Sequence, residues 1–132
     1  MSEAVLSELA AAVDGLLYPS ETDAPFDVVR WPGDGTPIEI GRLRELSGHA
    51  SGSPAEVISL DRLFEDLVTP QPWHGEAEKA TLARYANLRE AICRNLSDVR
   101  VFRIGEVRVD IYIIGVTAEG DWVGVRTMAV ET

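Results

Sequence analysis

Two histidines are the first residues to test for chemistry, because histidine serves both as a metal ligand and as a general base. His49 lies in a stretch rich in glycine and serine, and His74 lies between a proline-rich stretch and a glycine. The sequence has no His-x-x-x-His or Cys-x-x-Cys spacing that would indicate a structural metal site. We therefore expect two solvated loop histidines, and we assign the chain no catalytic residue, no metal ligand and no cofactor of its own.

Serine and glycine give no stronger signal of catalysis. Ser47 and His49 are close in sequence, but a catalytic pair is defined by spatial geometry and by an orienting acid. The segment Gly33-Asp34-Gly35 lacks the strand-to-helix glycine pattern of a phosphate-binding loop. The sequence favours binding over catalysis, so we expect no enzyme. An enzyme or small-ligand binder that uses His49 or His74 in an unforeseen pocket is the competing hypothesis.

Glu21 is the first candidate for a binding residue. It lies in a polar loop between Pro19 and Pro25. Each proline fixes its own φ angle, so the loop has less conformational freedom to lose when a partner binds the carboxylate. An exposed turn acid without a function is the other interpretation that the residue alone allows.

Trp73 is the second candidate. It follows the extended stretch Thr69-Pro70-Gln71-Pro72, which cannot continue either neighbouring helix. Tryptophan provides a large contact area and is enriched among interface hot spots. Burial of Trp73 against the core of its own domain is the alternative. Trp31 and Trp122 lie in strand-like patterns, so we expect both to pack internally or along the sheet.

Thr132, the last residue of the sequence, is the third candidate. It directly follows a predicted strand, whose pairing would hold the end of the chain in place. Its hydroxyl and terminal carboxylate are hard oxygen donors that suit Mg²⁺. A terminal residue without a function is the other interpretation.

Charge limits the classes of partner. The formal net charge is -10, from 22 acidic and 12 basic side chains, which argues against direct binding to DNA or RNA. A basic protein is a better partner, although acidity for solubility alone is an alternative. The single cysteine, Cys93, cannot form an internal disulfide, and its place in a helical pattern predicts a small buried hydrophobe. With no secretory leader and no apolar stretch of membrane-spanning length, we expect a cytoplasmic protein.

Periodicity predicts helices early in the chain and strands late. Apolar residues at helical spacing indicate a first helix that begins after Ser2 and ends before Pro19. From Val99 onward the period changes to two, which predicts an antiparallel β-meander and hence an α+β fold in one domain, residues 1–132. The other expected elements are a strand at 26–31, a helix from Pro37 to Gly48, a strand at 56–58, a helix capped by Ser59, a helix from Glu76 to Leu96, turns at 105–106 and 118–121, and a last strand at 122–130.

Several short stretches resemble the nuclease A inhibitor family in one colinear order. They are Asp14-Gly15-Leu16-Leu17-Tyr18-Pro19-Ser20-Glu21, Pro25-Phe26, Ser47-Gly48-His49, Thr69-Pro70-Gln71-Pro72-Trp73, Asn95-Leu96, Arg103-Ile104-Gly105-Glu106-Val107 and Val130-Glu131-Thr132. This resemblance implies a three-layer α/β/α sandwich related to the PR-1 (pathogenesis-related) fold.

The resemblance also implies a function. It points to an inhibitor that blocks the active site of a Mg²⁺-dependent, sugar-nonspecific DNA/RNA endonuclease of the ββα-metal type, as a monomer in a one-to-one complex. The family pattern places Glu21 in the active site of the nuclease, Thr132 at its catalytic Mg²⁺, and Trp73 at the interface as an exposed anchor. The alternative is an acidic regulatory module that binds a different basic protein.

Overall fold

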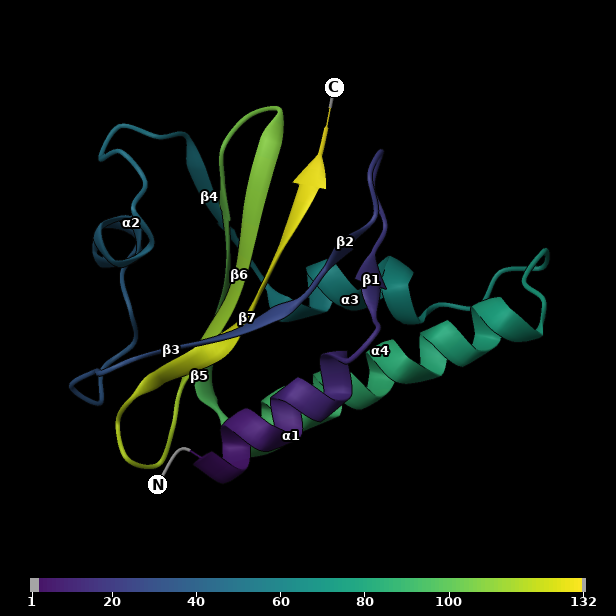
Figure 1. Cartoon of the computed structure of the whole chain (residues 1–132), viewed down its shortest axis with the longest axis horizontal. Coiled ribbons are helices and arrows are strands. Elements are labelled where there is room, and N and C mark those ends of the chain that lie inside the picture. The colour runs from purple at the N-terminus through teal and green to yellow at the C-terminus, as the bar shows by residue number, and fades with distance from the viewer. Residues whose placement is uncertain (1–2, 132) are drawn as a thin grey trace.

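A five-stranded antiparallel sheet forms the centre of the fold (Figure 1). The computed structural model of the protein describes residues 3–131. The strand order is β3-β7-β6-β5-β4, and the last three strands of the chain form the expected meander. The α+β class predicted from the sequence is therefore confirmed. The strands are β3 (Asp27–Trp31), β4 (Ala55–Ile58), β5 (Ser97–Ile104), β6 (Arg108–Val116) and β7 (Trp122–Val130).

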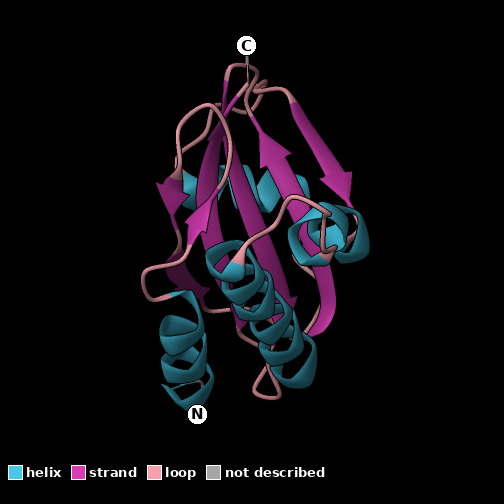
Figure 2. Cartoon of the chain, turned by 90° about the vertical axis from the view of Figure 1, so that its right-hand side faces the viewer, coloured by secondary structure: helices cyan, strands magenta, loops and turns pink. Residues whose placement is uncertain are grey.

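Helices cover both faces of this sheet. Three of them, α1 (Glu3–Val13), α3 (Leu60–Val68) and α4 (Glu76–Asn95), pack on one face, and Figure 2 shows that face from their side. The fourth, α2 (Ile40–Ser47), packs on the other face. Alternate residues of β6 join the two apolar clusters, because successive side chains of a strand point to opposite faces. None of the helices within residues 3–131 is long and apolar enough to cross a membrane.

Helix α4 confirms the helix predicted from Glu76 to Leu96. Tyr85, Leu88 and Ile92 are buried against the sheet side of the helix. Cys93 is exposed, so the prediction of a buried cysteine is wrong. Each helical residue is rotated by about 100° from the one before it, and this rotation carries Cys93 beyond the stripe that Leu88, Ala91 and Ile92 share.

The first helix ends earlier than the sequence pattern predicts. It stops at Val13, and Gly15 has a φ of 74°, in the left-handed region that terminates helices. The following residues, although apolar, form the short strand β1 (Leu17–Tyr18), which pairs with β2 (Ala24–Pro25). Together these two strands make a small hairpin outside the main sheet.

The second helix begins later than predicted, at Ile40 rather than at Pro37. Thr36 does not act as a helix cap, because its hydroxyl donates to Asp34 Oδ1 at 2.5 Å. Its carbonyl accepts a hydrogen bond from Trp122 Nε1 at 2.7 Å, which ties this loop to β7. The predicted end of the helix is confirmed, because Gly48 adopts a φ of 79° at the C-cap.

Candidate protein-binding site

Glu21 lies in the exposed connection of the β1–β2 hairpin. Ser20, the residue before it, holds the turn: its hydroxyl donates to the carbonyl of Thr22 at 2.7 Å and accepts from the N–H of Thr22 at 3.3 Å. Such local bonds between a serine hydroxyl and the backbone are typical of tight turns. The carboxylate of Glu21 is therefore presented on ordered backbone.

The hairpin is attached to the end of β7, although the two segments are far apart in the sequence. The N–H of Val130 donates to Ser20 Oγ at 3.1 Å. A second bond runs from Thr127 Oγ1 to the carbonyl of Pro25 at 2.9 Å. Figure 1 shows the hairpin beside the C-terminal end of β7. The residue before Glu21 and a residue two positions before Thr132 are thus in direct contact, while Thr132 itself lies outside the described residues.

Arg103 on β5 fixes the last described residue. Its Nη2 donates to Glu131 Oε1 at 2.5 Å, and its Nε lies 3.1 Å from Glu56 Oε1 on β4. The backbone N–H of Glu131 donates to the carbonyl of Val107 at 2.8 Å. Burial lowers the pKa of Arg103, but the bond with Glu131 and the nearby charges of Tyr18 and Glu56 outweigh it, so the pKa lies above its usual value. Arg103 of β5 and the carbonyl of Val107 therefore hold the residue that follows β7.

Trp73 lies on a turn between α3 and α4. The N–H of His74 donates to the carbonyl of Gln71 at 3.0 Å, and the N–H of Gln71 donates to His74 Nδ1 at 3.1 Å. Pro72 occupies the second position of this turn, where its fixed φ angle is favourable. Trp73 is 75% exposed. Among the aromatic rings of residues 3–131, its indole contacts only the ring of His74, edge-on, with 5.5 Å between the ring centroids. The alternative of burial against the core is therefore wrong.

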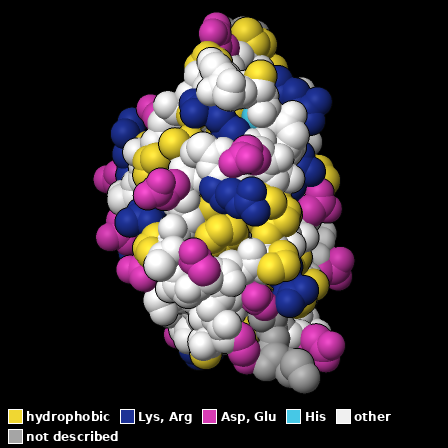
Figure 3. Space-filling model, turned by 90° about the vertical axis from the view of Figure 1, so that its left-hand side faces the viewer, with side chains coloured by type: hydrophobic (Ala, Val, Ile, Leu, Met, Phe, Trp, Pro, Cys, Tyr) yellow, Lys and Arg dark blue, Asp and Glu magenta, His cyan; other side chains and the backbone are white. Residues whose placement is uncertain are grey.

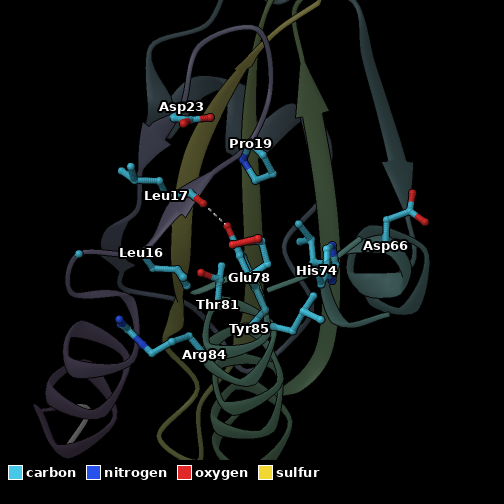
Figure 4. A pocket seen from close by; sticks show the side chains of 13 residues that line it. Leu16, Leu17, Pro19, Asp23, Asp66, His74, Glu78, Thr81, Arg84 and Tyr85 are labelled. Atoms are coloured by element: carbon cyan, nitrogen blue, oxygen red, sulfur yellow. Dashed lines mark hydrogen bonds between the residues drawn. The ribbon is translucent and has the colours of Figure 1, made fainter. Parts of the chain in front are cut away.

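A cavity of about 500 Å³ lies between the hairpin and the Trp73 turn (Figure 4). Pro19 and Asp23 line it from the hairpin, and His74 and Glu78 line it from the turn and α4. Tyr85 lies at its base, where its hydroxyl donates to the carbonyl of Leu17. Burial raises the pKa of Tyr85 far above its usual value, and the charges of Tyr18 and Asp23 raise it further.

Two further hollows extend this surface toward the end of β7. One, of about 400 Å³, includes Pro19, Asp66 and Arg103, and the next, of about 240 Å³, includes Arg103 and Glu131. Because neighbouring hollows share lining residues, one recessed face runs from the end of β7 past the hairpin to the turn that carries Trp73. We call this the hairpin face. The structure thus brings the Glu21 loop to β7 and places the Trp73 turn across a cavity from it.

The other histidine lies on the opposite side of the sheet, near α2. His49 Nε2 is 3.2 Å from both Asp110 Oδ2 and the hydroxyl of Tyr112, so the prediction of a solvated histidine is wrong here. Arg126 lies 3.9 Å from Asp110 Oδ1, and the group surrounds a hollow of about 300 Å³. Figure 3 shows this side of the molecule, where charged side chains of both signs lie among hydrophobic ones.

This cluster does not contain a serine nucleophile. The hydroxyl of Ser47 donates to the carbonyl of Leu43 at 2.6 Å, one turn earlier in α2, so it is not bonded to His49. A serine that donates back to the helix cannot at the same time donate its proton to an imidazole. The closeness of these two residues in sequence therefore does not produce a catalytic pair.

Sequence reasoning missed Ser20 and Arg103. Ser20 directly precedes Glu21, and Arg103 begins one of the stretches that carry the resemblance. Both residues therefore lie within motifs that the sequence analysis named. Their partners, Val130 and Glu131, lie 110 and 28 residues further along the chain. Neither periodicity nor motif spacing predicts contacts of that kind, because they depend on how the sheet assembles.

Within residues 3–131 no group of three or more histidine, cysteine or acidic side chains is arranged to hold a metal ion. A family model described as nuclease A inhibitor-like protein matches residues 3–132. A search of curated proteins found no significant match.

Proposed function

Because the chain belongs to the nuclease A inhibitor-like family, we propose that it inhibits a Mg²⁺-dependent, sugar-nonspecific DNA/RNA endonuclease of the ββα-metal type. It acts as a one-domain monomer that blocks the active site in a one-to-one complex. The Mg²⁺ belongs to the nuclease, and the inhibitor contributes no cofactor and no catalysis. The match of the family model over residues 3–132 supports inhibition of a nuclease, and the class of nuclease follows from the resemblance of the motifs.

The hydrogen bond between Ser20 Oγ and the N–H of Val130 is the observation that carries this proposal. It joins the loop of Glu21 to the strand that leads to Thr132. If Glu21 and Thr132 are to reach the same metal ion, the backbone segments that carry them must lie close together. The bond between the hairpin and Val130 supports that proximity, and Arg103, which lines a hollow together with Tyr18 and Pro19, bonds Glu131.

In the complex, each of the three predicted residues has a separate task. The carboxylate of Glu21 approaches the metal and the basic groups around it. Thr132 offers oxygens at an exchangeable position of Mg²⁺, a cation that normally keeps several waters. Trp73, already exposed before binding, contributes contact area that becomes desolvated.

The charge of the chain assists encounter. A nuclease cleft that attracts polyphosphate is basic, and a protein with a formal charge of -10 is attracted by the same field. This accounts for fast association, whereas the contacts on the hairpin face determine how slowly the complex dissociates.

Two further expectations belong to this proposal. Helices on both faces of the sheet support the three-layer α/β/α sandwich of the PR-1 type. A cytoplasmic location is supported by the single cysteine, which is exposed and forms no disulfide.

A titration tests the proposed function. A Mg²⁺-dependent nonspecific endonuclease is held at a concentration well above the dissociation constant, and residual cleavage of DNA and of RNA is measured as inhibitor is added. We expect both activities to end at one inhibitor per nuclease. The association rate should fall as salt rises, because screening shortens the range of the attraction. Full nuclease activity at a large excess of inhibitor contradicts the proposal and favours a different basic partner.

A further inference from the structure

The cavity between the hairpin and the Trp73 turn has an apolar base and an acidic rim. Leucine side chains and Tyr85 supply the apolar part. Three acidic residues from three different segments line the cavity, namely Asp23 of the hairpin, Asp66 of α3 and Glu78 of α4, and in Figure 4 the carboxylate of Asp66 points away from the other two. The leucines are Leu16, Leu17, Leu67 and Leu82.

The one arginine that lines the cavity does not neutralise this rim. Arg84 Nη2 donates to the carbonyls of Ala12 at 3.0 Å and of Asp14 at 2.7 Å. These carbonyls lie at the C-terminal end of α1, where a cation is favoured by the helix dipole and by the unpaired carbonyls. The guanidinium is therefore directed to the end of α1.

The three carboxylates have few partners of their own. Among residues 3–131 no ion pair involves Asp23, Asp66 or Glu78. Glu78 Oε1 accepts the N–H of Gly75 at 3.0 Å, which leaves its second oxygen for another donor. The negative potential reaches the base of the cavity, because the charge of Asp23 contributes to the raised pKa of Tyr85.

One exposed apolar side chain lines the cavity, and another belongs to the residue before the lining residue His74. Leu17 on the hairpin is 47% exposed, and Trp73 on the opposite turn is 75% exposed. A partner that covers both side chains closes over the opening between them. The group that such a partner inserts must have an apolar stem for the leucines and a cationic end for the carboxylates.

We propose that this cavity receives an arginine side chain of the protein partner. The aliphatic stem packs on Leu16 and Leu67, while the guanidinium donates to Asp23 and Glu78, and the charge of Asp66 adds to the negative potential of the rim. Arginine fits better than lysine, because its five donors form a planar fork that can bond carboxylates on several sides at once. The identity of the partner rests on the proposed function: a nuclease that neutralises phosphates carries such cations around its cleft.

The first test removes the charges and keeps the shapes. A variant with Asp23→Asn, Asp66→Asn and Glu78→Gln should bind the endonuclease about thirtyfold more weakly, because a desolvated guanidinium loses its counter-charges. Binding is measured as the dissociation constant at fixed salt, and the thermal unfolding midpoint is measured in parallel to establish that the variant folds.

A matched variant separates the cavity from general attraction. Glu39→Gln, Glu90→Gln and Asp98→Asn change the net charge by the same amount, and none of these residues lines the cavity. Asparagine also tolerates the positive φ of Asp98. We expect the affinity of this control to change less than about threefold, since screened surface charges contribute little to affinity. Equal weakening in both variants overturns the proposal.

A second test does not depend on the nuclease. Backbone amide resonances are followed while N-acetylarginine methylamide is added, and the neutral isostere N-acetylcitrulline methylamide serves as the control. We expect the arginine compound alone to shift the amides of Leu16, Leu17, His74 and Thr81, and we expect no shift in the Asp23→Asn, Asp66→Asn, Glu78→Gln variant. No shift with arginine, or equal shifts with citrulline, contradicts the proposal. If the wild type fails to inhibit the nuclease, the proposed function is wrong. The experiment with the arginine compound still shows whether the cavity binds an arginine side chain.

Discussion

The hairpin face and the His49 cluster use polar side chains in opposite ways. At the cluster, His49, Asp110, Tyr112 and Arg126 face one another beside α2, and Asp110 Oδ1 has no hydrogen bond within the described structure. On the hairpin face, Ser20 and Arg103 bond to chain segments, while Asp23 and Asp66 remain open to a partner. The side chains of the cluster contact one another across the sheet, whereas we propose that the hydrogen-bonded loops of the hairpin face contact a partner.

This contrast predicts that substitutions at the cluster change stability and that substitutions on the hairpin face change affinity. The largest expected effect is on stability, from Asp110→Ala. The change leaves the partly buried His49 without its carboxylate and Arg126 with only Asp27 as an ion-pair partner among the described residues, which should cost about 3 kcal/mol of unfolding free energy. Urea unfolding measures the loss, and the inhibition constant should stay within about twofold of the wild type. A large loss of inhibition in a folded Asp110→Ala protein breaks the contrast.

Trp73→Ala should have the largest effect on affinity. Removal of a central aromatic anchor costs about 2 kcal/mol of binding free energy, or about thirtyfold in Kd. Because the side chain is 75% exposed, the unfolding free energy should change by less than about 0.5 kcal/mol.

The matched control for Trp73 is Val57→Ala. Val57 is 54% exposed but pairs with Phe102 on the α2 side of the sheet. Isothermal titration against the nuclease should give the wild-type Kd for this variant. Equal losses for the tryptophan and valine variants indicate that exposed apolar area in general, and not the Trp73 turn, governs binding.

Ser20→Ala should have a smaller effect on both properties. It removes the acceptor of the Val130 N–H and loosens the turn that carries Glu21. We expect about 1 kcal/mol of lost stability and about a fivefold increase in Kd, because the hairpin must be reordered on binding. Ser51→Ala, in the exposed loop after α2, should change neither value. An unchanged Kd for Ser20→Ala shows that the attachment to β7 does not serve binding.

The smallest effect is a pH dependence that arises at the base of the cavity. Burial raises the pKa of Tyr85 above its ordinary value of about 10, so the folded state favours the neutral phenol. Its contribution to stability is complete below pH 10 and is lost as the pH rises toward the higher folded pKa. Urea midpoints measured between pH 8 and pH 11 should therefore fall for the wild type and fall less for Tyr85→Phe. Parallel curves contradict the assignment.

The sequence predicted those elements whose apolar period is strong. The apolar stripe of α4 and the alternation in the last three strands are both found in the structure. The helix buries one side and the strands bury one or both faces, and this burial sets the period of their apolar residues. The end of α1 was missed because Leu16 continues the helical period, although Gly15 ends the helix. The start of α2 was missed because Thr36 bonds to Asp34 and to Trp122, a residue from the other end of the chain.

For the site, the sequence suggested candidate groups but not the residues that position them. The sequence left both burial and exposure of Trp73 open, and the structure shows the side chain 75% exposed. Arg103 and Asp66 could not be assigned, because their neighbours on the hairpin face come from β4, β7 and the hairpin. Such contacts between distant segments are set by strand order and register, which local patterns do not contain.

The coupling between Glu21 and Thr132 in nuclease inhibition tests whether both groups act at one metal ion. The inhibition constant of the Mg²⁺-dependent endonuclease is determined for the wild type, for Glu21→Gln, for the chain that lacks Thr132, and for the chain with both changes. If both groups act at one metal ion, each single change weakens inhibition and the double change costs at least about 1 kcal/mol less than the sum. Losses that add within about 0.3 kcal/mol, or no loss from either change, contradict the claim that the hairpin and the end of the chain meet at the metal of the nuclease.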